Sequence, residues 1–119
     1  MLELFWIDAQ NKEYHLGNLY KIDDNYFFDI ISDELKQAVK HGCFGIGNID
    51  ITKEKQESKE LFSFFKNRIP DRNDLTEQEL LEQYGINVYD EMEILKITEG
   101  RMLKDRYYLK YIEDNLNIM

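Results

Sequence analysis

Paired acidic side chains are the residues of this 119-residue chain that could do chemistry by their type and spacing. The pairs are Asp23/Asp24, Asp33/Glu34, Glu91/Glu93 and Glu113/Asp114. Two carboxylates held close together can bind a metal ion or exchange protons with a substrate. These pairs fall at expected turns and helix starts, where acidic side chains cap the backbone and complement the helix dipole. The spacing therefore favours structural roles, and a small carboxylate-based hydrolase is left as an alternative.

The histidines and the single cysteine show no spacing typical of a catalytic or metal site. His15 and His41 lie far apart in the sequence. Cys43 is the only cysteine and lies in a glycine-rich stretch, so we expect it to be a buried structural thiol. That stretch lacks the strand-to-helix context of a dinucleotide fingerprint, and the chain has no P-loop and no kinase catalytic loop. We therefore expect no catalysis, cofactor or metal, and no binding of ATP–Mg²⁺.

Composition and charge predict the broad class of the protein. Hydrophobic residues make up 43% and charged residues 33%, with a net charge of −9, as in a globular domain with a substantial core. Residues 1–119 are expected to form one domain. The acidic balance, without a basic stripe, argues against direct nucleic-acid binding and against an anionic membrane surface. With neither a basic leader nor a long apolar run, the expected location is the cytoplasm.

The elements that must position these residues follow from the hydrophobic pattern. Apolar and aromatic runs predict strands at 2–7, 14–22, 26–31 and 107–112, with tight turns at 10–11 and 23–25. Gly17 interrupts the second strand and predicts a bulge or a close backbone approach. Residues 32–41 predict a helix with Ser32 as N-cap and Gly42 beyond its end. Residues 52–58 are charged and are expected to form an exposed loop.

A phenylalanine-rich segment precedes the only proline, Pro70. The apolar residues of 61–69 fit one face of a helix that begins near Ser58. Pro70 disfavours helical geometry before it, so this helix should end near residue 67 or 68. Phe65 is expected in the core. Arg68 is expected to stay exposed, so that Arg68→Ala changes stability by no more than about 0.5 kcal/mol.

Two further helices are predicted beyond this corner. Thr76 and Glu79 fit a capping box for a helix that stops at Gly85. Asp90 and Glu93 fit another, for a helix that runs to Gly100. Together these elements predict an α+β fold, a small antiparallel meander or partial barrel packed with three to four short helices.

The order of these pieces resembles the N-terminal subdomain of HipA-type toxin kinases over nearly the whole chain. The matching stretches are residues 16–19 (LGNL), 26–28 (YFF), 61–71 (LFSFFKNRIPD), 90–100 and 107–112, and the corner in 61–71 is the most specific of them. Two departures stand out. The family usually has a proline in the segment that here reads FGIGNIDI, and it prefers an apolar residue where Arg68 stands.

The resemblance implies a regulatory role without kinase activity, because the family's ATP-binding and catalytic motifs lie downstream of this subdomain. It suggests an antitoxin-like subunit that docks on a HipA-like serine/threonine kinase of a toxin–antitoxin module, and it leaves open whether a helix-turn-helix repressor joins the same complex. The glycine-rich loop (residues 42–47) and the corner (residues 66–74) are the candidate contacts. Their candidate residues are Phe44, Ile46, Asn67, Arg68, Asp71 and Arg72. The alternative is a free-standing protein-binding module of the same fold.

Overall fold

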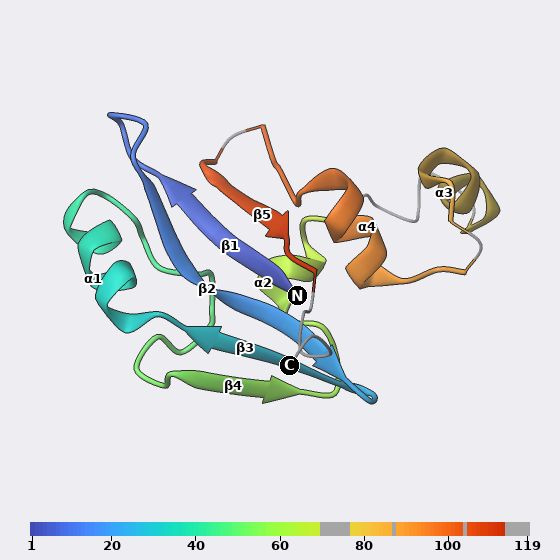
Figure 1. Ribbon diagram of the computed structural model, residues 1–119, viewed down its shortest axis with the longest axis horizontal. Helices are drawn as coiled ribbons and strands as arrows, with labels where there is room; N and C mark the ends of the chain where they lie inside the picture. Colours follow the sequence, from blue (N-terminus) through green and yellow to red (C-terminus); the bar gives the residue numbers. More distant parts are fainter. Residues whose placement is uncertain (70–76, 87, 104, 114–119) are drawn as a thin grey trace.

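The computed structural model describes residues 1–69, 77–86, 88–103 and 105–113, which form an α+β fold (Figure 1). The elements in chain order are β1 (Leu2–Ile7), β2 (Glu13–Ile22), β3 (Asn25–Ile30), α1 (Ser32–Lys40), β4 (Lys55–Ser58), α2 (Ser63–Lys66), α3 (Glu77–Tyr84), α4 (Glu91–Thr98) and β5 (Tyr107–Tyr111). The strands form one antiparallel sheet in the order β4-β3-β2-β1-β5. The predicted fold class is confirmed, with β4 and β5 at the edges of an open sheet.

Two tight turns connect β1, β2 and β3 as predicted. Asn11 has a φ of 66° and Asp23 a φ of 55°. Asn and Asp adopt this left-handed conformation more readily than other non-glycine residues, so both turns suit their residues. The meander therefore forms from contacts between neighbours in the sequence.

Gly17 lies at a close backbone approach, as its place in a strand pattern predicted. The register between β1 and β2 shifts here, because Leu4 pairs with Gly17 whereas Phe5 pairs with His15. A Cβ atom at Gly17 would lie 2.5 Å from the carbonyl oxygen of Asp29 on β3. Only glycine fits this position without a shift of the neighbouring strand.

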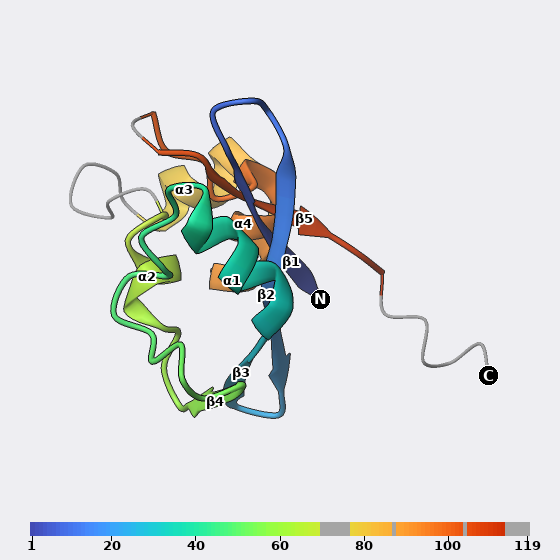
Figure 2. The ribbon, with the colours of Figure 1, turned by 90° about the vertical axis from the view of Figure 1, so that its left-hand side faces the viewer.

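Helices α1, α2 and α4 lie on the same side of the sheet (Figure 2). The core between these layers is built from alternate strand residues and one face of each helix. Its fully buried members include Leu4, Leu16, Leu19, Phe28, Ala38, Phe65 and Leu95. The predicted core position of Phe65 is confirmed, since its side chain is 0% exposed.

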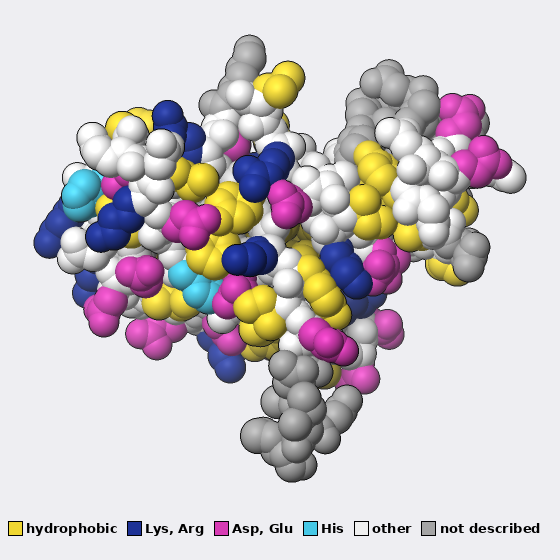
Figure 3. All heavy atoms as spheres, turned by 45° about the horizontal axis from the view of Figure 1, so that its top comes forward, with side chains coloured by type: hydrophobic (Ala, Val, Ile, Leu, Met, Phe, Trp, Pro, Cys, Tyr) yellow, Lys and Arg dark blue, Asp and Glu magenta, His cyan; other side chains and the backbone are white. Residues whose placement is uncertain are grey.

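No described element covers the opposite face of the sheet. Aromatic side chains stack on one another there, and most of them are partly exposed, although Tyr108 is only 7% exposed. Phe5 stacks on His15 and on Tyr108, with ring centroids 4.9 and 5.3 Å apart, and Tyr20 stacks on Phe27 at 5.4 Å. Figure 3 shows one view of the surface, on which hydrophobic side chains lie among positive and negative ones.

Residues 55–58 form strand β4, so the prediction of a loop over 52–58 was wrong there. Asp29 to Tyr26 of β3 pair with Lys55 to Ser58 of β4 in antiparallel register. Charged side chains at the exposed edge of a sheet give a hydropathy pattern like that of a loop. The strand is held by backbone hydrogen bonds, which the side-chain pattern does not report.

Helix α2 is shorter than predicted and begins at Ser63. Phe62 is extended, with φ −57° and ψ 139°, so the helix cannot begin near Ser58. Its predicted end near residue 67 is confirmed by the C-cap at Asn67. The predicted N-cap role of Ser32 was wrong: α1 begins at Ser32 itself, and its hydroxyl donates to a Glu54 carboxylate oxygen at 3.4 Å.

The later helices end and begin largely as predicted. Helix α3 stops before Gly85, which has a φ of 69°; Thr76 lies outside the described residues. Asp90 caps α4, because its carboxylate accepts from the backbone N–H of Met92 at 2.9 Å and of Glu93 at 3.4 Å. Across the part of the chain that the structure describes, no helix combines the length and apolar character needed to span a membrane.

Candidate partner-binding site

Three segments far apart in the sequence meet beside α2. They are the glycine-rich loop (residues 42–47), the described part of the corner (residues 66–69) with Phe64 before it, and residues 100–103 and 105–107, which lie between α4 and the start of β5. Phe64 and Tyr107 join two of them, with ring centroids 5.1 Å apart in an edge-to-face arrangement. The structure thus brings together the predicted glycine-rich loop and the described part of the predicted corner, residues 66–69, with a third segment that the sequence did not single out.

Arg68 is buried at the centre of this meeting point, which overturns the prediction that it stays exposed. The residue is 7% exposed. Its guanidinium donates to the Asp105 carboxylate, with Nη2 2.5 Å from Oδ2, and to the carbonyl oxygen of Gly100 at 2.9 Å. These partners lie 37 and 32 residues further along the chain, so no local pattern could reveal them.

Two aromatic rings enclose the Arg68 guanidinium. Its central carbon lies 4.4 Å from the ring centroid of Phe64 and 5.1 Å from that of Tyr107. A planar guanidinium can stack on such rings while its edge donates to a carboxylate. Nε of Arg68 is buried without a hydrogen-bond partner in the described residues. The side chain therefore packs as an aromatic or apolar residue would, and also forms a charged pair.

Buried residues anchor the glycine-rich loop on both sides of Phe44. Cys43 is 4% exposed, which confirms its predicted burial, and Ile46 is 0% exposed. Ile46 was a candidate contact residue, and this part of the prediction was wrong because the side chain belongs to the core. Gly45 has a φ of 95° and Gly47 a φ of 55°, conformations that favour glycine.

The hydroxyl of Tyr107 holds the middle of this loop. It donates to the carbonyl oxygen of Gly45 at 2.5 Å, and Sγ of Cys43 lies 3.6 Å from the same hydroxyl. Burial, followed by the contact with Cys43, raises the pKa of Tyr107 well above its ordinary value. A tyrosine hydroxyl is protonated at neutral pH even without this shift, so it can act as a donor here.

We choose four of the exposed residues of these segments and call them the docking surface: Phe44, Asn67, Met102 and Leu103. Phe44 is 100% exposed although Cys43 and Ile46 beside it are buried. Asn67 and Met102 line a shared hollow of about 430 Å³ with Gly47 and Phe64. Of the other candidates, Asp71 and Arg72 lie outside the described residues.

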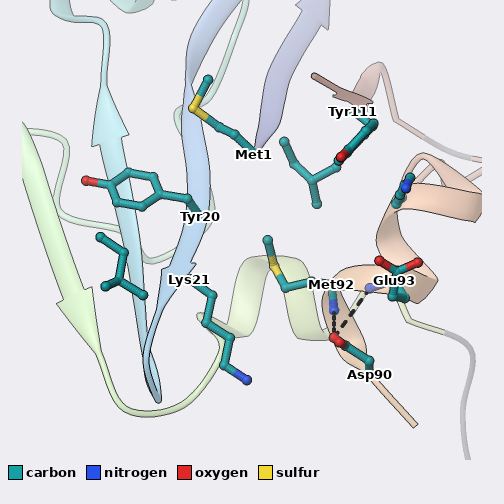
Figure 4. A pocket seen from close by; sticks show the side chains of 10 residues that line it. Met1, Tyr20, Lys21, Asp90, Met92, Glu93 and Tyr111 are labelled. Atoms are coloured by element: carbon teal, nitrogen blue, oxygen red, sulfur yellow. Dashed lines mark hydrogen bonds between the residues drawn. The ribbon is translucent and has the colours of Figure 1, made fainter. Parts of the chain in front are cut away.

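A second hollow of about 570 Å³ lies between α4 and the ends of β1, β2 and β5 (Figure 4). Its lining includes two carboxylates, Asp90 and Glu93, which the hydrolase alternative would need. Oδ1 of Asp90 already accepts the two backbone N–H groups at the start of α4. Lys96, three residues after Glu93 on α4, also belongs to the lining, and its Nζ lies 3.9 Å from the ring centroid of Tyr111.

The histidines are held at separate places by different partners. Nε2 of His15 lies 2.7 Å from Oδ1 of Asn18 and 3.6 Å from a Glu3 carboxylate oxygen. His41 follows α1, and its Nδ1 lies 2.9 Å from the carbonyl oxygen of Gln37. Among the residues that the structure describes, no group of three or more His, Cys, Asp and Glu side chains is placed to hold a metal ion.

Sequence reasoning missed Tyr107, Asp105 and the exposed pair Met102 and Leu103. Tyr107 was predicted only as the first residue of a strand, and its hydroxyl contact spans 62 positions. Met102 and Leu103 follow Gly100, where the helix was expected to end. Two apolar residues just after a helix end were the one signal in the sequence, and the structure shows that both are exposed. Comparison with known proteins finds no matching family model, curated protein or solved structure.

Proposed function

We propose that this chain is a non-catalytic subunit that docks, through the docking surface, on a HipA-like serine/threonine kinase of a toxin–antitoxin module. The observation that carries the proposal is Phe44, an aromatic side chain fully exposed on an anchored loop. A few aromatic anchors supply most of the binding energy in protein interfaces. An exposed phenylalanine between two buried neighbours suits such an anchor, and it contributes nothing evident to the core.

The loop around Phe44 favours tight association, because its backbone is already fixed before a partner binds and the entropy cost of binding is therefore small. Cys43 and Ile46 are buried on either side, and Gly45 is held by Tyr107. A side chain presented by a fixed backbone loses less conformational entropy when it enters a partner's pocket than one on a mobile loop does. Met102 and Leu103 add exposed apolar area, and Asn67 supplies a polar rim.

The position of Arg68 supports the resemblance on which the choice of partner rests. The family prefers an apolar residue here, and Arg68 is buried between Phe64 and Tyr107 as an apolar residue would be. Arg68 thus fills the buried position that an apolar residue would fill, and it adds a charged group there. The alternative, a free-standing binding module outside any toxin–antitoxin system, would use the same docking surface for another protein.

The neighbouring genes separate these two functions at little cost. A shortened kinase gene beside a helix-turn-helix repressor gene favours the toxin–antitoxin role, and an unrelated neighbourhood favours the free-standing module. A co-encoded kinase can then be co-expressed with the tagged chain and recovered by pull-down. We expect a stable complex at micromolar concentration. No complex at that concentration, or no such kinase gene, would overturn the proposal.

Phe44→Ala tests the surface itself by calorimetric titration against that kinase. Loss of the anchor should weaken affinity at least tenfold, or about 1.4 kcal/mol. Ile22→Ala is the matched control, because Ile22 is also an exposed apolar residue, at the far end of β2. Equal affinities for Phe44→Ala and the unmodified chain would show that the kinase binds elsewhere.

A further inference from the structure

The tip of the glycine-rich loop is held by hydrogen bonds in addition to the buried Cys43 and Ile46 on either side of it. A Cβ atom added at Gly45 would meet no atom within 4 Å. The carbonyl oxygen of Gly45 nevertheless accepts from the Tyr107 hydroxyl at 2.5 Å and from Sγ of Cys43 at 3.6 Å. The Tyr107 hydroxyl is thus the contact that ties the loop, one residue after Phe44, to strand β5.

Tyr107 is in turn fixed by the corner. Its ring stands edge-on to Phe64 at 5.1 Å, and the Arg68 guanidinium lies 5.1 Å from its centroid. Arg68 is itself held by Asp105, two residues before Tyr107, and the Tyr107 backbone N–H donates to that same carboxylate at 3.3 Å. The contacts therefore run without a gap from the corner through Tyr107 to the loop.

We propose that Tyr107 is a positioning residue, a latch whose hydroxyl fixes the glycine-rich loop so that Phe44 is presented in one orientation, and that Arg68 holds the latch in place. The binding part of this inference rests on the proposed function, whereas the latch is a property of the isolated chain. Tyr107 acts through Phe44, and Phe44 contacts the partner.

Tyr107→Phe tests the latch, because it removes the hydroxyl and keeps the ring in contact with Phe64 and Arg68. Tyr111→Phe is the matched control, on the same strand but exposed. In the isolated chain, amide hydrogen exchange at residues 43–47 should become about fivefold to tenfold faster with Tyr107→Phe, the effect of one hydrogen bond. Exchange in β1 and β2 should stay unchanged, and the control should leave the loop unchanged.

Affinity for the co-encoded kinase gives a readout that a general loss of stability would not produce. Tyr107→Phe alone should weaken binding about fivefold to tenfold. Added to Phe44→Ala it should weaken binding no further, because a latch has no effect once the side chain that it positions is gone. An additive double mutant would show that Tyr107 does not act through Phe44, and would overturn the inference.

The loop exchange separates failure of the latch from failure of the proposed function. Unchanged exchange with Tyr107→Phe overturns the latch even where the kinase binds. Faster loop exchange in a chain that binds no kinase supports the latch and removes the proposed partner. Arg68→Lys keeps the charge but loses the planar fork, so it should also speed exchange at residues 43–47. This second variant decides the inference if Tyr107→Phe does not fold.

Discussion

The turn at Asp8 and the corner at Arg68 bury the two charged side chains that are shielded from solvent in the described part of the chain. Asp8 finds its partners locally. Its carboxylate accepts from the backbone N–H groups of Gln10 and Lys12 and from the Tyr14 hydroxyl, each at 2.9 Å and within six residues. Arg68 depends on Gly100 and Asp105, which are brought to it only by the complete fold.

The two networks therefore differ in the part of the fold that stabilises them. The Asp8 network closes a hairpin turn and can form as soon as β1 and β2 pair. The Arg68 network joins the residues after α2 to the residues before β5, so it forms only when the tertiary structure is complete. Damage at Asp8 should therefore be modest and depend on pH, whereas damage at Arg68 should be large and affect the whole domain.

Phe65→Ala gives the reference for this comparison and the largest expected effect. Its side chain is 0% exposed and packs between Phe28 at 5.3 Å and Phe64 at 5.1 Å. The cavity left by the ring should lower the free energy of unfolding by about 3–5 kcal/mol in a urea melt. A loss below about 1 kcal/mol would mean that the corner is not built on this core.

Arg68→Ala comes next and replaces the expectation of a negligible effect. Removal of the guanidinium takes its hydrogen bonds from the partly buried Asp105 carboxylate and from the Gly100 carbonyl oxygen, leaves the carboxylate without its counter-charge, and opens space between two rings. We expect a loss of about 3 kcal/mol in the free energy of unfolding, measured by urea melts. Lys66→Ala, an exposed change two residues away, should stay within about 0.5 kcal/mol. Equal melts for both variants would show that the buried arginine makes no net contribution.

Acidification should reveal the smallest effect, at Asp8. Its pKa is lowered, chiefly by the hydrogen bond from the Lys12 backbone and also by the Tyr14 hydroxyl. Because the folded pKa is below the unfolded one, the carboxylate adds stability above its ordinary pKa, and this stability is lost as the pH falls through the folded value. In Asp8→Asn, melting temperature should therefore fall less than in the unmodified chain below about pH 4. Identical pH profiles would contradict this account, and Tyr14→Phe should show part of the same change.

Local chemistry explains which parts of the fold could be predicted. The meander turns, the close approach at Gly17 and the Asp90 cap depend on residues close in sequence or on the lack of a side chain. The β4 strand could not be predicted, because its backbone pairing with β3 leaves no apolar alternation. The early start expected for α2 failed for a related reason: the extended conformation of Phe62 is set by tertiary packing.

The candidate site was predictable only in its exposed parts. Phe44 and Asn67 are exposed, as contact residues must be, and their role in binding stays a prediction. Arg68 and Ile46 were misjudged because burial at a corner or in a loop depends on what packs over it. That covering comes from Tyr107 and Asp105 near β5, and neither carries a sequence signal directed at the corner.

The pairing of β1 with β5 has a consequence for the order of folding. These strands come from opposite ends of the described chain, and they align from Leu2 opposite Tyr111 to Trp6 opposite Tyr107. Contacts between distant parts of a chain form slowly, whereas a hairpin such as β1–β2 forms in roughly microseconds. The docking surface depends on Tyr107, so it can mature only in this late step. During synthesis on the ribosome, a nascent chain that still lacks β5 would therefore carry Phe44 on an unlatched loop, and competence to bind would signal that the sheet is complete.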